Sequence, residues 1–254
     1  MTPPWRDDFA APPPFLPLRP WAARLTEPGW PSLNRLNALA EQANLANADG
    51  LPLRFGLQEQ RCGQRDYEAG ILATGTVPTR AENWHDLLNA LCWLSFPRTK
   101  AALNRVQCAA LPPGQPRGRL SDAATLFDES GLILTGPEPE LARLLAGHQW
   151  RQVFVQHRAA WRDTRAYVVG HAVLEKLLAP WPGITAKCLF VPAKQASEPL
   201  AELDTRVAAL WQEGAVTRPA ELFPVPVLGI PGWWPANEDP DFYADQNVFR
   251  PPRH

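Results

Sequence analysis

The sequence predicts a single α+β domain that is dominated by helices, with a small mixed or antiparallel sheet and long extended termini. Apolar residues recur at helical spacing through the middle of the chain, apolar segments of strand length are few and short, and proline is concentrated at both ends. We therefore expect three parts. These are an extended proline-rich segment over 1–31, an α+β core domain over 32–218, and an extended proline-rich segment over 219–254 that packs on the core.

The overall composition is that of a globular protein without a global charge field. Hydrophobic residues make up 45% and charged residues 20% of the chain, and the net charge of -1 gives no general attraction to nucleic acid or to an anionic membrane. No apolar stretch approaches the roughly 18 residues of a membrane span, and the N-terminus lacks the pattern of a secretory signal. The four cysteines form no C-x-x-C pair, which argues against a zinc ribbon. We expect a cytoplasmic protein with reduced thiols.

Both ends of the chain combine proline with large apolar side chains. The chain contains twenty-nine prolines and eleven tryptophans. Proline disfavours helix interiors and central strands, so turn or polyproline geometry is expected at the termini rather than repetitive structure. Because aromatic residues alternate with the prolines from Trp5 to Trp30 and from Phe223 to Phe249, we expect these segments to lie across the core rather than to extend into solvent.

The segment between the termini shows a series of helix and strand patterns. Helices are expected over 32–47 with Ser32 as N-cap, in DYEAGILATG up to Gly75, on both sides of Pro97, and around 138–146, 149–162, 170–179 and 200–213. Strands are expected in LPLRFGLQ after Gly50 and over 186–191, and AATLFDESGLILTG predicts a β-hairpin with its turn at Asp128–Gly131. We find no internal repeat and no phosphate-binding loop motif.

The helix expected from Trp84 to Phe96 is apolar on both faces, yet it carries polar side chains that need partners. Asn83 and Asp86 are explained as an N-cap and its reciprocal partner. His85 and Asn89 lie one turn apart on one face and have no such role. Two interpretations stay open: an imidazole and an amide that only fix the packing, or a site in which His85 is a general base or metal ligand and Asn89 orients it.

Two further groups could complete such a site. His171 and Glu175 are four residues apart on an expected helix, so both could reach one metal ion, or the carboxylate could fix the tautomer of the imidazole. An ordinary ion pair on a helix edge has the same spacing. Asp128 and Glu129, with Asp122 and His171, could offer ligands to a divalent metal ion, although acidic residues are common in turns without one.

Two clusters of basic residues could bind an anion. The first spans a stretch without acidic residues and consists of Arg98, Lys100, Arg105, Arg117 and Arg119; the second lies beside Trp150 and Trp161 and consists of Arg151, Arg158, Arg162 and Arg165. Basic side chains among aromatic ones could contact phosphate or nucleic acid. We favour intramolecular pairing with acidic residues such as Glu138, Glu140 or those of NEDPDFYAD.

The stretch VPTRAENWHDLLNALCWLSFPRTKAALN, together with FDESG, GHAVLEK, PVPVLGIPGW and FRPPR, resembles a bacterial family of unknown function, domain-of-unknown-function family 3025. The residues that fit its pattern are Asn83, Trp84, His85, Asp86, Asn89, Ala90, Phe96, Pro97, Lys100, Asn104, Asp128, Glu129, His171 and Glu175. Gln107 and Ser121 depart from the pattern, which has a histidine near the first and an arginine at the second. The resemblance implies no activity, substrate or catalytic residue.

Two hypotheses of different classes follow. In the first, the chain is a hydrolytic enzyme, metal-assisted in one version, in which His85 is base or ligand, Asn89 orients it, and His171 with Glu175 or Asp128 completes the site. The alternative is a non-catalytic interaction or scaffold protein whose buried polar residues are structural. A separation of more than about 10 Å between His85 and both His171 and Asp128, with no pocket between them, would exclude the shared site.

Overall fold

Helices predominate in the structure, a computed structural model that describes residues 3–58, 63–110, 118–193 and 198–251. The α-helices are α1 Arg19–Ala22, α2 Leu33–Gln42, α3 Gln64–Thr74, α4 Trp84–Ser95, α5 Pro97–Ala109, α6 Arg119–Ser130, α7 Pro139–Ala146, α8 His171–Leu177 and α9 Leu200–Gln212. Within the described residues, none of the helices has the length and apolar composition needed to cross a membrane.

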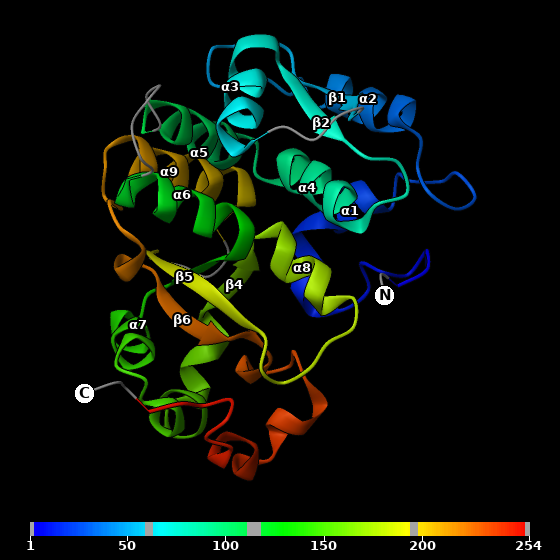
Figure 1. Cartoon of the computed structure of the whole chain (residues 1–254). Coiled ribbons are helices and arrows are strands. Elements are labelled where there is room, and N and C mark those ends of the chain that lie inside the picture. Colours follow the sequence, from blue (N-terminus) through cyan, green and yellow to red (C-terminus); the bar gives the residue numbers. More distant parts are fainter. Residues whose placement is uncertain (1–2, 59–62, 111–117, 194–197, 252–254) are drawn as a thin grey trace.

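Two small sheets accompany the helices in the described part of the chain (Figure 1). The first sheet pairs two short strands in parallel, β1 Arg54–Leu57 and β2 Thr76–Thr79. The second has the order β4-β3-β5-β6 and consists of β3 Gly131–Gly136, β4 Arg165–Val168, β5 Thr185–Pro192 and β6 Phe223–Pro226. It is mixed, because β3 runs parallel to β5 and the two outer pairs are antiparallel. The chain is therefore α+β and helix-dominated, as the sequence predicts.

Strand β3 lies in the middle of the protein and is buried along its whole length. Leu132 pairs with Val168 on one side and with Cys188 on the other. Successive side chains serve different cores: Leu132 packs into one cluster of buried apolar residues, and Ile133 packs into a second one. A continuous apolar run is typical of a strand that is covered on both faces.

The β-hairpin predicted around Asp128 is wrong. Residues up to Ser130 continue α6, and the chain passes directly into β3 at Gly131. The buried positions Ala123, Ala124 and Phe127 recur at helical spacing, and β3 finds its partners in β4 and β5, far along the chain. Gly131 makes the abrupt junction possible, because a Cβ there would lie 2.3 Å from the carbonyl oxygen of Phe127.

Helix α4 is buried at every residue except His85. The expectation that both of its faces are covered is thus confirmed. The Asn83 side chain accepts a hydrogen bond from the backbone N–H of Asp86, which confirms the N-cap. The expected reciprocal bond is not made, because the Asp86 carboxylate accepts hydrogen bonds from the backbone and guanidinium of Arg80 instead.

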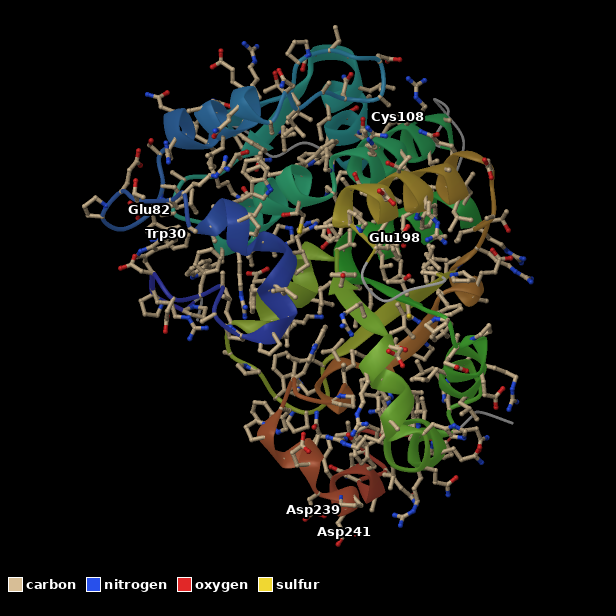
Figure 2. The ribbon with its side chains drawn as sticks, turned by 180° about the vertical axis from the view of Figure 1, so that it is seen from behind. Trp30, Glu82, Cys108, Glu198, Asp239 and Asp241 are labelled. Atoms are coloured by element: carbon tan, nitrogen blue, oxygen red, sulfur yellow. The ribbon has the colours of Figure 1, made fainter. Side chains whose placement is uncertain are left out.

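The terminal segments pack on the core, but they contain more regular turns than the sequence analysis expects. Residues Pro13–Leu18 form a 3₁₀-helix, η1, that leads into α1 and contacts α4, β4 and α8. Proline fits here because its fixed φ suits the first turn of a helix. At the other end, short 3₁₀-helices include Pro235–Glu238 and Pro240–Ala244, with Asp239 and Asp241 at the end of the molecule remote from α2 and α3 (Figure 2).

The single helix expected over 149–162 is also wrong in detail. The segment forms a π-helical turn, η2 Gln152–Gln156, followed by a 3₁₀-helix, η3 Arg158–Asp163. The other expected helices and strands lie within a few residues of their predicted positions. These two short elements lead the chain into β4, at the edge of the mixed sheet.

Candidate functional site

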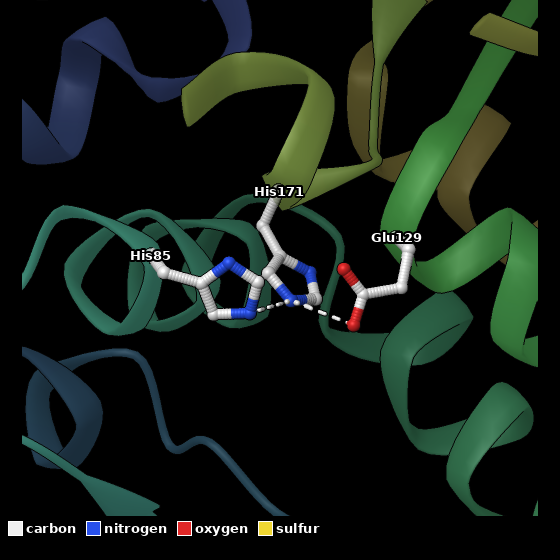
Figure 3. A group of neighbouring side chains, drawn as sticks. All are labelled: His85, Glu129 and His171. Atoms are coloured by element: carbon white, nitrogen blue, oxygen red, sulfur yellow. Dashed lines mark hydrogen bonds and ion pairs between the residues drawn. The ribbon is translucent and has the colours of Figure 1, made fainter. Parts of the chain in front are cut away.

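The N-terminal ends of α4 and α8 meet the C-terminal end of α6 and bring two histidines and a glutamate together (Figure 3). His85 is the second residue of α4, His171 is the first residue of α8, and Glu129 is the last but one residue of α6. A backbone contact holds α6 and α8 in this position: a Cβ at Gly170 would lie 2.4 Å from the backbone nitrogen of Gly131 and 2.6 Å from the carbonyl oxygen of Glu129. Only glycine permits this approach, which sets Glu129 next to His171.

The two imidazoles face each other through their Nε2 atoms, which lie 3.1 Å apart. Their rings are nearly perpendicular, at 73°. The Nε2 atom of His171 is 3.6 Å from Oε1 of Glu129, and one donor atom from each of the three residues lies within 4.8 Å of the others. The histidines are thus far closer than the separation that excludes a shared site.

Glu175 fixes the orientation of His85 rather than that of His171. Its Oε2 lies 2.9 Å from Nδ1 of His85, across from α8 to α4. A carboxylate can only accept, so His85 carries its proton on Nδ1 and presents the free electron pair of Nε2 to His171. His171 and Glu175 do lie at one site, as their spacing in the sequence suggests. Glu175, however, bonds to the ring of His85 and not to that of His171.

His171 is a neutral imidazole at neutral pH. It is 3% exposed, and burial lowers its pKa well below the usual range, with Lys100 and His85 acting in the same direction. Its Nδ1 atom is buried without a hydrogen bond and lies 3.9 Å from Oδ2 of Asp128. A neutral ring is the form that can act as a metal ligand or as a base.

Glu129 is held in surroundings that disfavour its charge. Burial raises its pKa, and the neighbouring Asp128 carboxylate raises it further, while His85 and Lys100 act in the opposite direction. The carboxylates of Asp128 and Glu129 are adjacent at the end of α6 and repel each other, so the charged form of Glu129 is disfavoured.

A hydrogen-bonded network of buried polar side chains lies next to the histidines. Lys100, 2% exposed, donates to Oδ1 of Asp128 at 2.5 Å and to Oδ1 of Asn89 at 2.8 Å. The amide nitrogen of Asn89 in turn donates to the Tyr67 hydroxyl at 3.1 Å. Asn89 therefore bonds to Lys100 and Tyr67 rather than to His85. Asp128 is neutralised by Lys100 through Oδ1, while its Oδ2 lies 3.9 Å from Nδ1 of His171.

The histidines open onto a pocket of about 440 Å³, which we call the histidine pocket. Besides His85, His171 and Glu129, its polar walls include Tyr67, Glu68, Arg80, Gln107 and Thr125. Glu68 is the most unusual of these, because burial raises the pKa of its carboxyl to about 7 and Asp128 adds to the shift, against a hydrogen bond from Asn104. The pocket thus contains a group that exchanges a proton near neutral pH.

Tyr67 and Glu68 are site residues that the sequence analysis does not identify. They belong to α3, where the pattern DYEAG gives no sign that its polar residues are buried. Lys100 is considered there as part of a basic cluster and of the family pattern, but not as a partner of Asn89 or Asp128. The sequence indicates these residues only indirectly. Asn89 lies on a helix that is apolar on both faces, so its polar partners have to come from other helices or strands.

Four of the basic residues considered as an anion surface, Arg98, Lys100, Arg105 and Arg158, have acidic partners within the protein. Arg98 donates from its backbone and side chain to Asp204 and Thr205, and Arg105 pairs with Asp49. Arg119 is exposed, and Arg117 lies outside the described residues. In the second cluster Arg158 pairs with Glu238 of NEDPDFYAD. Asp122, named with the metal candidates, does not line the histidine pocket.

Comparison with known proteins places the chain in a family. The family described as "Protein of unknown function (DUF3025)" matches residues 53–253. The chain belongs to the DUF3025 family. No curated protein and no solved structure matches the chain significantly. The DUF3025 description assigns no activity, so the chemistry of the histidine pocket has to be argued from its own residues.

Proposed function

We propose that the histidine pocket is the active site of a metal-dependent hydrolase, in which His85, His171 and Glu129 bind one divalent metal ion. The observation that carries the proposal is the approach of the two Nε2 atoms to 3.1 Å with a carboxylate oxygen 3.6 Å away. Ligand atoms bound tetrahedrally to zinc at ordinary bond lengths lie about 3.3 Å from one another. Two of the three distances are close to this value, and the third, between His85 and Glu129, is within 4.8 Å and would shorten on a rotation of the Glu129 side chain.

The tautomers of the two histidines support an ion between them. Glu175 holds the proton of His85 on Nδ1, and the Asp128 carboxylate beside Nδ1 of His171 favours a proton there as well. Both Nε2 electron pairs then point at the same place. The electron pairs of the two Nε2 atoms repel each other at this distance. A cation that accepts both pairs would remove this repulsion and form a bond with each nitrogen.

Two histidines and one glutamate are a ligand set found in catalytic zinc sites. A divalent ion held by these residues would supply an activated water for attack on a carbonyl or phosphoryl centre. Glu68 lines the same pocket and titrates near pH 7, with a raised pKa of about 7. It is the group best suited to give a proton to the leaving group as the scissile bond breaks.

Metal analysis and thermal melting test the ligand set. Zinc at 100 times its dissociation constant should raise the melting temperature by roughly 5–10 °C in the wild type. The shift should be lost in His85→Ala and His171→Ala and kept in His157→Ala, which removes an exposed histidine outside the pocket. Absence of metal binding, or an equal shift in all four proteins, would contradict the proposed site.

Hydrolysis is tested separately with the metal-loaded protein and chromogenic carboxylic, phosphoric and peptide-like substrates. We expect turnover of one class, abolished by a chelator and by Glu129→Gln, and restored by zinc in the wild type. A protein that binds zinc at these residues but turns over none of the classes would retain the metal site and refute the hydrolase.

A further inference from the structure

A second pocket, of about 500 Å³, lies where three distant segments of the chain meet. Its walls come from η1, from the stretch between Arg158 and Tyr167 in η3 and β4, and from residues 230–233 after the last strand of the sheet. None of its lining residues lines the histidine pocket. We call it the arginine pocket.

The charge in the arginine pocket is positive and largely unbalanced. Arg158, Arg162 and Arg165 line it, and no aspartate or glutamate does. Arg158 is neutralised by Glu238 at 2.7 Å. Arg165 donates only to the backbone oxygens of Arg162 and Thr164, and Arg162 makes no ion pair with any residue that the structure describes. The neighbouring Asp163 is exposed and lies outside the lining, so two guanidinium groups face the pocket without a carboxylate partner.

Beside the arginines the pocket offers flat and apolar surfaces. Trp161 is 8% exposed, while Tyr167 and Trp233 are half-buried. Leu16 of η1 is 48% exposed, which makes it one of the few large apolar side chains on the surface of the described chain. Burial raises the pKa of the Tyr167 hydroxyl, Arg165 lowers it, and the Glu198 carboxylate adds a smaller upward shift. Cationic and aromatic groups are thus adjacent in one hollow.

We propose that the arginine pocket binds a small phosphorylated molecule with a planar ring, of the nucleotide class. Guanidinium groups bind phosphate oxygens in pairs, and their planar shape suits this better than an ammonium group does. The aromatic side chains give the ring a surface on which to stack. The volume lies within the range of small-molecule sites.

The dimensions of the charged surface favour a small ligand over a nucleic acid strand. A polymer gains affinity from many phosphate contacts along a basic groove. Here the net charge is -1, and the pocket brings together only Arg158, Arg162 and Arg165 among the described residues. A ligand in this hollow would touch η1, β4 and the segment around Trp233 at once, and would therefore join both terminal segments to the sheet.

Calorimetric titration with adenosine 5′-monophosphate, adenosine and inorganic phosphate tests the proposal. The monophosphate should bind the wild type at least tenfold more tightly than either fragment does. Arg162→Gln and Arg165→Gln should each weaken its binding at least tenfold. Both arginines are exposed, so folding should be kept, and circular dichroism checks this. Arg151→Gln is the matched control, because Arg151 is an exposed member of the same sequence cluster outside the pocket lining.

Three outcomes would overturn the inference. The first is no binding of the monophosphate to the wild type. The second is equal binding by the wild type and by Arg162→Gln and Arg165→Gln. The third is tighter binding of a single-stranded oligonucleotide that Arg151→Gln weakens as much as Arg162→Gln does, because this would indicate an extended nucleic-acid surface instead of a pocket.

Discussion

The histidine pocket and the arginine pocket treat charge in opposite ways. In the histidine pocket the charged groups are largely buried, and a connected set of partners from α3, α4, α5, α6 and α8 satisfies most of them. In the arginine pocket Arg162 and Arg165 are exposed, and water can solvate them without a protein partner. Leaving a charge without its partner should therefore be costly in the first pocket and nearly neutral for folding in the second.

The largest effect is expected from Lys100→Met. The change leaves the carboxylate of Asp128 without its buried partner, and breaking a buried pair in this way costs about 3–5 kcal/mol of unfolding free energy. Arg105→Met is the matched control: it breaks the exposed pair with Asp49 and should cost less than about 1 kcal/mol. Urea unfolding measures both values. Equal small losses would show that the buried network has no special weight.

The next effect concerns Glu68 and depends on pH. Its carboxyl holds a proton in the folded protein up to a pKa of about 7, against an ordinary value of 4.5. Between these two values the folded state binds more protons than the unfolded state, so the stability contributed by this group falls as pH rises from 4.5 to 7. Burial and the carboxylates of Asp128 and Glu129 raise the pKa, whereas Asn104 and Lys100 lower it.

Glu68→Gln removes this titration and should make the protein more stable at pH 8 by up to about 3 kcal/mol. At pH 4.5 the same change should be nearly neutral. Glu41→Gln, an exposed carboxyl on α2, serves as control and should leave the pH profile unchanged. Chemical unfolding at a series of pH values gives the comparison. A destabilised Glu68→Gln protein at pH 8 would mean that the Glu68 carboxylate is charged and well paired.

The smallest of the three effects is expected from Glu175→Gln. The substitution keeps an acceptor for Nδ1 of His85 but removes its charge, and loss of such a partner typically weakens metal binding by about 10- to 100-fold. Folding should be preserved, because Glu175 is only half-buried. Lys176→Gln, an exposed neighbour on α8, should leave zinc affinity unchanged. Isothermal titration calorimetry with zinc measures the affinity of each variant. If Glu175→Gln binds zinc as tightly as the wild type, Glu175 has no role in metal binding.

Local sequence patterns predict most helices of this protein because their signals are complete in themselves. Pro97 separates α4 from α5, Gly75 ends α3, and Asn83 caps α4. The error around Asp128 has a different origin. The partners of β3 lie some 35 to 55 residues further along the chain, as the pairing of Leu132 with Val168 and Cys188 shows. No pattern inside AATLFDESGLILTG carries that information, so a local hairpin is the natural but incorrect reading.

The sequence indicates several residues of the candidate site, but it does not indicate which of them contact one another. His85 stands out because a polar group on an apolar helix needs a partner, and His171 with Glu175 because they are four residues apart on an expected helix. Glu129 is considered as an acidic residue of the expected turn, although it belongs to α6. Which group serves which depends on the contact of Gly170 with Gly131, which brings α6 against α8 and cannot be inferred from either segment alone. For the same reason the sequence suggests Asn89 as the partner of His85, whereas Glu175 from another helix has that position.

The proposed metal site is tested by a crystal structure of the protein soaked with zinc, with data recorded at the zinc absorption edge. We expect one strong anomalous peak in the histidine pocket, at about 2.0–2.2 Å from Nε2 of His85, Nε2 of His171 and a carboxylate oxygen of Glu129. A map with no peak at these three residues, and with a hydrogen bond between the two Nε2 atoms in its place, would contradict it.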